Sequence, residues 1–145
     1  MPTSKIFLPD SNVWLALLSR RHVHSHVAVH WLGGAGDRQL AFCRISQMGV
    51  LRLLTNRHVM GVDVRLPKEA WRVYEDALKD WRIRFLPEPG TLEGVWKNLT
   101  QNVPPNAWTD AYLMAFAQDQ GLRIVTFDRG FERFGDPDTV ILANG

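Results

Sequence analysis

The stretch Leu122-Arg123-Ile124-Val125-Thr126-Phe127, followed at once by Asp128, carries the clearest structural signal in the chain. Its short apolar run, rich in β-branched residues, is typical of a strand buried in a sheet. The segment 107–120 directly before it predicts a helix that ends at Gly121, because glycine commonly follows the last turn of a helix. A helix that leads into a buried strand indicates a parallel sheet covered by helices.

The same alternation continues toward both ends of the chain. Other short apolar runs predict strands at 5–8, 39–43, 83–86 and 139–142. The segments between them predict helices at 12–18, 23–32, 45–55, 67–80 and 91–100, with a loop or frayed helix at 56–66. Ser11 is the expected N-cap of the first helix. We therefore predict an α/β fold, a single three-layer α/β/α domain over residues 1–145 with a central parallel sheet of four or five strands.

Composition limits the classes of function. The 145 residues are 46% apolar and carry 17 basic against 15 acidic side chains, a net charge of +2 that does not favour nucleic-acid binding through bulk charge. The charge is uneven, because residues 1–73 hold 10 basic and 4 acidic groups while 74–145 hold 7 and 11. The single cysteine, Cys43, excludes an internal disulfide, and no apolar run is long enough to span a membrane. We expect a cytoplasmic protein without a membrane partner.

Aspartates follow two of the predicted strands. Asp10 ends the first strand and Asp128 follows the strand at 122–127. Because ligands of parallel sheets bind at the carboxyl ends of the strands, these carboxylates share one crevice if their strands are neighbours. Asp110, in the first turn of the helix at 107–120, can point into the same crevice. Three carboxylates that lie so close repel one another, so the site must raise a pKa or bind a cation.

A cation at these acids would be Mg²⁺, with Mn²⁺ as the alternative, because both prefer hard oxygen ligands. Such an ion polarises a phosphate and lowers the pKa of a bound water, which is the chemistry of phosphodiester hydrolysis. Simpler interpretations exist, since an aspartate after a strand often caps a helix or a turn and Asp110 suits the helix dipole. A receiver-like phospho-acceptor domain would also need a late lysine, and no lysine occurs after Lys97.

Three segments resemble the PIN domain, and within it the VapC-type toxins of bacterial toxin–antitoxin systems. They are 8–17, with Leu8-Pro9-Asp10-Ser11-Asn12-Val13, then 44–56, and then 109–131. The resemblance spans nearly the whole chain, in the right order. It implies a Mg²⁺- or Mn²⁺-dependent endoribonuclease with an RNA substrate, a cognate antitoxin partner, and assembly as a homodimer or as a larger complex with the antitoxin.

Carried across residue by residue, the resemblance assigns catalysis and metal binding to Asp10, Asp110 and Asp128. It gives supporting roles to Asn12, two residues after the first acid, and to Thr126, two before the last. The family usually has a glutamate in its third helix, where this chain has Gln47. A neutral amide oxygen is the weaker ligand, so we expect one metal ion, or a second ion that binds only with RNA. The same departure leaves open a non-catalytic PIN-like module that binds RNA or protein, and a DNA nuclease is the third alternative.

Two further residues are candidate RNA contacts. Arg52 shares the predicted helix of Gln47 and suits phosphate, and Trp108 lies two residues before Asp110, where its ring could stack on a base. A solvated surface or simple packing is the plainer alternative for each. Four histidines lie within 22–30, and two i,i+4 pairs among them, His22 with His26 and His26 with His30, share a helix face and could bind Zn²⁺. No nearby acid or cysteine completes a tetrahedral site, which favours a structural or surface role.

Overall fold

The computed structural model describes residues 6–34 and 36–143. Its strands are β1 (Ile6–Pro9), β2 (Gln39–Phe42), β3 (Ile83–Phe85), β4 (Arg123–Thr126) and β5 (Val140–Ile141). Its helices are α1 (Ser11–Leu18), α2 (Ser25–Gly33), α3 (Arg44–Leu54), α4 (Arg57–Met60), α5 (Pro67–Ala77), α6 (Leu92–Leu99) and α7 (Trp108–Gln120). Short 3-10 turns occupy η1 (Gly61–Asp63), η2 (Pro105–Ala107) and η3 (Arg129–Phe134).

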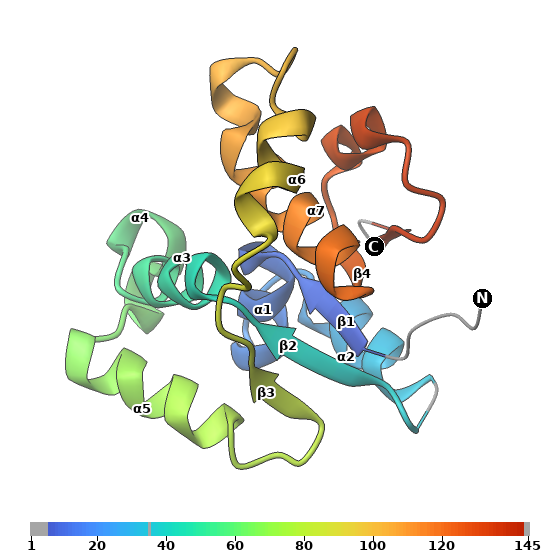
Figure 1. Cartoon of the computed structure of the whole chain (residues 1–145). Coiled ribbons are helices and arrows are strands. Elements are labelled where there is room, and N and C mark those ends of the chain that lie inside the picture. Colours follow the sequence, from blue (N-terminus) through green and yellow to red (C-terminus); the bar gives the residue numbers. More distant parts are fainter. Residues whose placement is uncertain (1–5, 35, 144–145) are drawn as a thin grey trace.

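The five strands form one parallel sheet in the order β3-β2-β1-β4-β5. β1 and β4 are neighbours in register, with Leu8 opposite Ile124 and Pro9 opposite Val125. Helices cover both faces of the sheet, so the α/β prediction is confirmed (Figure 1). The carboxyl ends of β1 and β4 therefore meet at one edge, which was the condition for a shared crevice.

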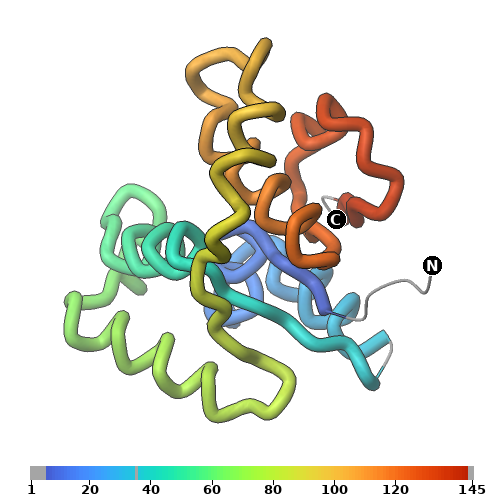
Figure 2. The backbone as a smooth tube through the Cα atoms, viewed as in Figure 1, coloured from blue at the N-terminus to red at the C-terminus, as the bar shows by residue number. Residues whose placement is uncertain are grey.

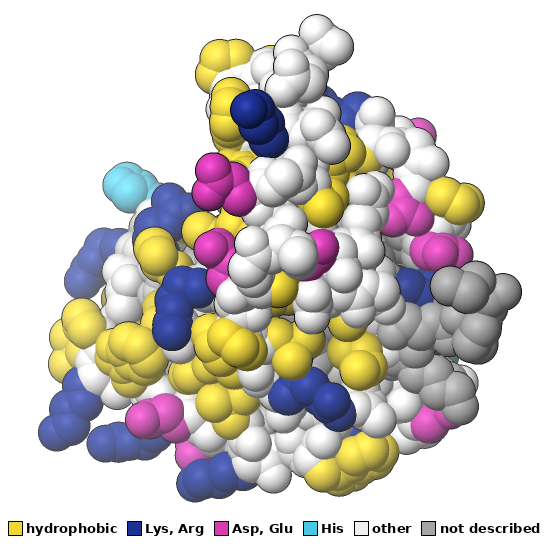
Figure 3. All heavy atoms as spheres, viewed as in Figure 1, with side chains coloured by type: hydrophobic (Ala, Val, Ile, Leu, Met, Phe, Trp, Pro, Cys, Tyr) yellow, Lys and Arg dark blue, Asp and Glu magenta, His cyan; other side chains and the backbone are white. Residues whose placement is uncertain are grey.

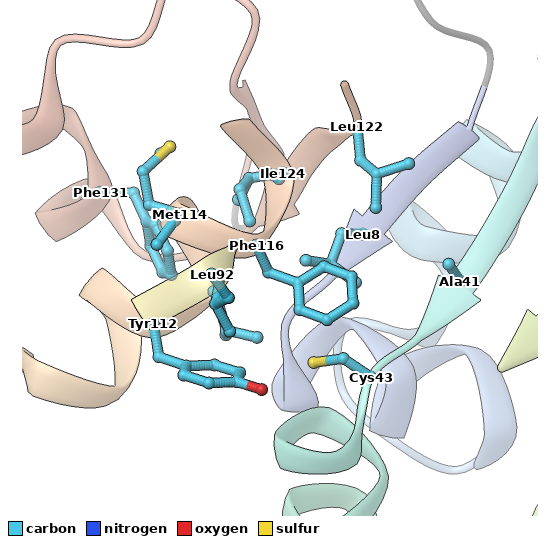
Figure 4. Packing of buried hydrophobic residues seen from close by; sticks show 13 residues of the cluster. Leu8, Ala41, Cys43, Leu92, Tyr112, Met114, Phe116, Leu122, Ile124 and Phe131 are labelled. Carbon is cyan, nitrogen blue, oxygen red and sulfur yellow. The ribbon is translucent and has the colours of Figure 1, made fainter. Parts of the chain in front are cut away.

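One face of the sheet packs against α6, α7 and η3. Leu8, Ala41 and Ile124 point from three neighbouring strands toward this layer. There they meet Phe116 of α7 and other buried side chains of the same layer (Figure 4). Residues 111–117 of α7 are buried without interruption, which explains why this part of its sequence is apolar on all sides rather than on one stripe.

The opposite face packs against α1, α2, α3 and α5. Phe7, Leu40 and Phe42 alternate with the residues of the first layer and point to this side. Trp14 of α1 lies fully buried and stacks on Phe42 with a centroid separation of 3.7 Å. The apolar face of α1 is therefore core.

Three helix ends differ from the sequence-based predictions, and one of them is the end of α5, which lies at Ala77 rather than at residue 80. Asp10, rather than Ser11, is the N-cap of α1, since its Oδ1 accepts the backbone N–H of Val13 at 3.0 Å. The second helix begins at Ser25 rather than near Val23, which leaves residues 19–24 as a turn. Gly121 does end α7, with a φ of +67° that an L side chain adopts only under strain.

α6 packs on the first half of α7, and this pair projects from the rest of the molecule (Figure 2). Trp96 of α6 makes an edge contact with Trp108 and donates its indole N–H to the backbone oxygen of that residue. Among the described residues, no helix is long and apolar enough to cross a membrane.

Gly49 lets α3 lie against the start of α1. A Cβ at this glycine would fall 2.9 Å from the Cβ of Ser11 and still closer to its hydroxyl. Real Cβ atoms do not approach that closely, so a larger residue must push the two helices apart.

Gly49→Ala is expected to lower the free energy of unfolding by about 1–3 kcal/mol, because overpacking shifts the backbone of α1 or α3. Urea denaturation measures this effect. Gly94→Ala on α6 is the matched control, because a Cβ there meets no other atom, and it should be neutral or stabilising. Ser11→Gly should restore most of the loss in the double variant, and failure to do so would place the strain elsewhere.

Candidate active site

The site begins with a hydrogen bond that continues the sheet past the end of β1. The backbone N–H of Asp10 donates to the carbonyl oxygen of Val125 at 3.0 Å, so Asp10 leaves the sheet directly beside the end of β4. Its side chain is only 8% exposed. One carboxylate oxygen is taken by the N-cap bond to α1, which fixes the orientation of the group.

Thr126 connects the two strand-end acids. Its buried hydroxyl donates to Oδ2 of Asp10 at 2.6 Å. The hydroxyl oxygen of Thr126 also accepts the backbone N–H of Asp128 at 2.9 Å. Each carboxylate oxygen of Asp10 thus has one donor, and the polypeptide turn that presents Asp128 is anchored to the same hydroxyl.

Asp128 is exposed and is the N-cap of η3. Its Oδ1 accepts the backbone N–H of Gly130 at 2.7 Å, and a Cβ at Gly130 would lie 3.0 Å from that oxygen. Asp110 is half-buried in the first turn of α7. Burial raises the pKa of Asp110, and the charge of Asp128 raises it further, so the two acids lie within electrostatic range.

Asp10 carries the largest electrostatic cost of the three acids. Burial raises the pKa of its carboxyl from 3.8 to about 6, and the charges of Asp110 and Asp128 add to this increase. The hydrogen bonds from Thr126 and Val13 oppose the shift by stabilising the ionised form. A cation bound beside these carboxylates would offset their mutual repulsion and so lower the free energy of the site.

The donor set fits a hard divalent cation, because it consists of carboxylate oxygens, and hydrogen bonds already orient those of Asp10 and Asp128. Within 6–34 and 36–143, no three His, Cys, Asp or Glu side chains lie close enough together to hold an ion as they stand. The three predicted acids thus do not form a ready-made ligand set among the described residues. Their assignment as metal ligands therefore stays a prediction.

Gln47, the residue at the position of the expected glutamate, is buried on α3. Its Oε1 accepts from the guanidinium of Arg44 at 2.6 Å, and its side chain also hydrogen-bonds Tyr74. Arg44 in turn lies over the ring of Phe85. The amide oxygen is thus engaged by an arginine, a partner that a metal ion would have to displace.

A pocket of about 360 Å³ lies at this edge of the sheet. It is lined by Asp10, Asn12, His22, His24, Phe127 and Asp128. Asn12, Asp10 and Asp128 were expected near one another, whereas the two histidines were not. The prediction that His22 and His26 share one helix face is wrong, because α2 begins only at Ser25 and His22 lies in the turn before it. The remaining pair, His26 and His30, is exposed and lines a different pocket.

The two candidate RNA contacts lie away from this pocket. Arg52 is exposed in the last turn of α3, five residues beyond Gln47. Trp108 is 47% exposed and borders a separate pocket of about 380 Å³ with Trp96 and Lys97. A basic residue that sequence reasoning missed is Arg133 of η3, whose charge lowers the pKa of Asp110. Its position depends on η3, an element that the sequence did not predict.

Comparison with known proteins now adds to this geometry. A family model described as the PIN domain matches residues 7–137. The chain belongs to this family. Ribonuclease VapC41 of Mycobacterium tuberculosis is 39% identical over 145 residues, which cover 95% of this chain and 99% of the relative. Ribonucleases with a PIN domain generally depend on a divalent metal.

Solved structures of VapC toxins share the fold. The crystal structure of VapC20 of Mycobacterium tuberculosis, a toxin that cleaves the sarcin–ricin loop, has a TM-score of 0.69 at 18% identity and covers 93% of this chain and 98% of its own. VapBC2 of Rickettsia felis, bound to a DNA fragment from its promoter, has a TM-score of 0.66 at 12% identity, with coverages of 94% and 96%. At these identities the likeness concerns the PIN fold alone.

The raised pKa of Asp10 predicts a specific pH dependence of stability in EDTA. Between its ordinary value of 3.8 and the folded value of about 6, the folded protein binds the proton more tightly than the unfolded chain does. Stability from this group is therefore lost as pH rises through that window, by about 3 kcal/mol in total.

Asp10→Asn, which cannot ionise, should not show this loss. Urea unfolding of both proteins in EDTA across the window measures the difference between them, in which the contributions of groups that do not interact with Asp10 cancel. A divalent cation should return part of the lost stability to the wild type only, because binding to the folded state stabilises it. A difference in the free energy of unfolding between the two proteins that stays constant with pH would show that the pKa of Asp10 is not raised in the folded protein.

Proposed function

We propose that this chain is a metal-dependent endoribonuclease that acts as the toxin of a toxin–antitoxin pair. The observation that carries the proposal is the pair of carboxylates joined through Thr126 at the ends of β1 and β4. A PIN domain and 39% identity to a VapC ribonuclease, over nearly the full length of both chains, support it. RNA is the expected substrate, and an antitoxin is the expected partner.

Asp10, Asp110 and Asp128 would hold the ion, for which we propose Mg²⁺ with Mn²⁺ as a substitute. When bound, such an ion polarises the scissile phosphate and lowers the pKa of a water for in-line attack. The chain itself fixes Asp10 through the N–H of Val13 and the hydroxyl of Thr126, so this carboxylate needs little reorganisation.

Positive charge near the acids would offset their repulsion of RNA. Arg133 already interacts with Asp110, and its guanidinium donates to the backbone oxygen of Gly130, which holds it at the start of η3. Arg52 and Trp108 remain candidate contacts for more distant parts of the RNA, through phosphate and through stacking. The substrate path would then run from the acid pocket toward the end of α3, which carries Arg52, and toward the start of α7, which carries Trp108.

The antitoxin needs an apolar surface to bind, and α5 with its preceding turn supplies one. Val62 and Leu66 are 93% and 68% exposed, and Trp71 is about half exposed. Hydrophobic side chains gather over the start of α5, with arginine and lysine side chains at their margin (Figure 3). Exposed apolar groups that cluster in this way mark partner surfaces.

One observation favours a second candidate, a PIN module that binds RNA without cleaving it. Gln47 replaces the glutamate that the family usually has, and its oxygen is bound to Arg44. With one negative charge fewer, metal affinity falls. Cleavage of RNA that stops on addition of EDTA separates the two candidates.

Asp10→Asn, Asp110→Asn and Asp128→Asn are each expected to lower the rate of RNA cleavage by at least about a hundredfold, because each removes a charge that binds the ion. Cleavage of total RNA in Mg²⁺, with tRNA and rRNA resolved on a gel, measures this rate. Asp119→Asn, at the other end of α7 from Asp110, is the control and should cleave normally. Circular dichroism checks that each variant is folded, and full cleavage by folded Asp10→Asn would overturn the proposal.

Gln47→Glu is expected to tighten Mn²⁺ binding about tenfold or more, because it restores a carboxylate at the family's position. Isothermal titration measures the affinity and the number of ions bound. Gln39→Glu is the matched control, because Gln39 is also bonded by an arginine, Arg84, but lies at the amino end of β2. Two tight sites in the unmodified protein would refute the expectation of a single ion, and an unchanged affinity in Gln47→Glu would refute the placement of Gln47.

A further inference from the structure

The turn between α1 and α2 sends its side chains in two directions. His22 and His24 line the acid pocket together with Asp10 and Asp128. Arg21, between them and α1, turns away and pairs with Asp63 of η1 at 3.0 Å. The histidines thus contribute to the proposed active site without belonging to its set of acids.

The hydrogen bonds of the turn fix the tautomer of His22. Its Nδ1 accepts the backbone N–H of His24 at 3.0 Å, so the proton of the neutral ring lies on Nε2. Burial and the neighbouring His24 lower the pKa of His22, which keeps the ring neutral near pH 7. Two backbone bonds, from His22 to Ser19 and from Ser25 to His22, hold the turn in place. His22 therefore presents one neutral N–H donor beside the acids.

His24 supplies a flat surface next to this donor. Its ring packs on Phe127, with centroids 4.9 Å apart and a tilt of 35°. Phe127 lies between Thr126 and Asp128, so this aromatic wall is continuous with the strand end that carries the acids. The rings of His22 and His24 are themselves 5.6 Å apart.

An aromatic wall and a neutral donor beside a cluster of acids match the needs of a single nucleotide. Bases of single-stranded RNA stack on aromatic rings, and the sugar–phosphate backbone offers oxygen acceptors. A neutral N–H can donate to an oxygen of the nucleotide, whereas a positively charged ring would be drawn into an ion pair with the neighbouring aspartates.

We propose that the pocket between His22 and His24 is a nucleotide subsite. This inference rests on the proposed ribonuclease function. The subsite holds the nucleotide next to the scissile phosphate. The base packs against His24 and Phe127, and Nε2–H of His22 donates to an oxygen of that nucleotide's ribose or phosphate. The two histidines set the position of the RNA strand over the acids.

Metal binding is the competing explanation, and at His22 the hydrogen bond to its ring opposes it. With Nδ1 accepting from His24 and Nε2 protonated, His22 has no free lone pair for an ion. Binding a metal through Nε2 would require the proton to move to Nδ1, and binding through Nδ1 would use the lone pair that accepts from His24, so either mode breaks that hydrogen bond. In the described part of the chain, moreover, no metal-binding group of three such side chains forms.

The test compares His22→Ala and His24→Ala with His26→Ala, an exposed histidine of the neighbouring helix that lines another pocket. In Mg²⁺, each of the first two should raise KM for a short single-stranded RNA roughly tenfold, with a smaller change in kcat. His26→Ala should leave both constants unchanged. His22→Gln, which keeps an amide donor, and His24→Phe, which keeps the flat ring, should recover most of the loss.

Binding measured without cleavage separates this subsite from the function on which it rests. Fluorescence anisotropy in EDTA should show the same weakening of RNA binding in His22→Ala and His24→Ala, while isothermal titration shows an unchanged Mn²⁺ affinity. An RNA with a single 2′-deoxy substitution that removes the effect of His22→Ala would identify the ribose as the acceptor, and a persisting effect would identify the phosphate.

Three outcomes are decisive against one claim or the other. Unchanged KM and unchanged RNA binding in folded His22→Ala and His24→Ala would overturn the subsite. Loss of Mn²⁺ affinity in His22→Ala would overturn it in favour of a metal ligand. If the unmodified protein binds RNA through these histidines but never cleaves it, the subsite stands and the ribonuclease function fails.

Discussion

The structure depends on the parallel pairing of β1 with β4. This pairing joins residues separated by more than 110 positions in the chain, and it continues one residue past β1 through the bond from Asp10 to Val125. Without it, Asp10 and Asp128 would be unrelated turn residues. With it, the hydroxyl of Thr126 can bond the first acid and the backbone of the second at once. One backbone register thus creates both the centre of the sheet and the chemistry at its edge.

That arrangement concentrates negative charge where burial makes charge costly. Asp10 is nearly buried, caps α1 and carries a raised pKa, so structural and chemical roles coincide in one carboxylate. The simpler interpretation of Asp10 as a helix cap is therefore correct, and it does not compete with a role in the site. The near-balanced net charge hides this feature, because a cation at the acids would offset part of the acidic count.

Patterns within single elements made most of the fold predictable. Short apolar runs and Gly121 placed the strands and the end of α7, because local burial and backbone conformation leave marks in the local sequence. The family resemblance pointed to the acids in advance, and the PIN-domain match confirms the family. Predictions failed where a side chain's partner decides the outcome. Ser11 was chosen as the cap over Asp10, and the start of α2 was placed too early, which put His22 on a helix that does not include it.

The sequence by itself determined the α/β class and the order of the main elements, and it predicted the three acids from their positions and from the family pattern. Only the tertiary structure decided that η3 brings Arg133 to Asp110 and that His22 and His24 enter the acid pocket. The physical reason is that strands and helices are encoded by periodic local burial, whereas these contacts join segments that are distant in sequence or lie in irregular turns. Such contacts produce no periodic pattern of apolar residues in the sequence, so only the packed structure shows which residues meet.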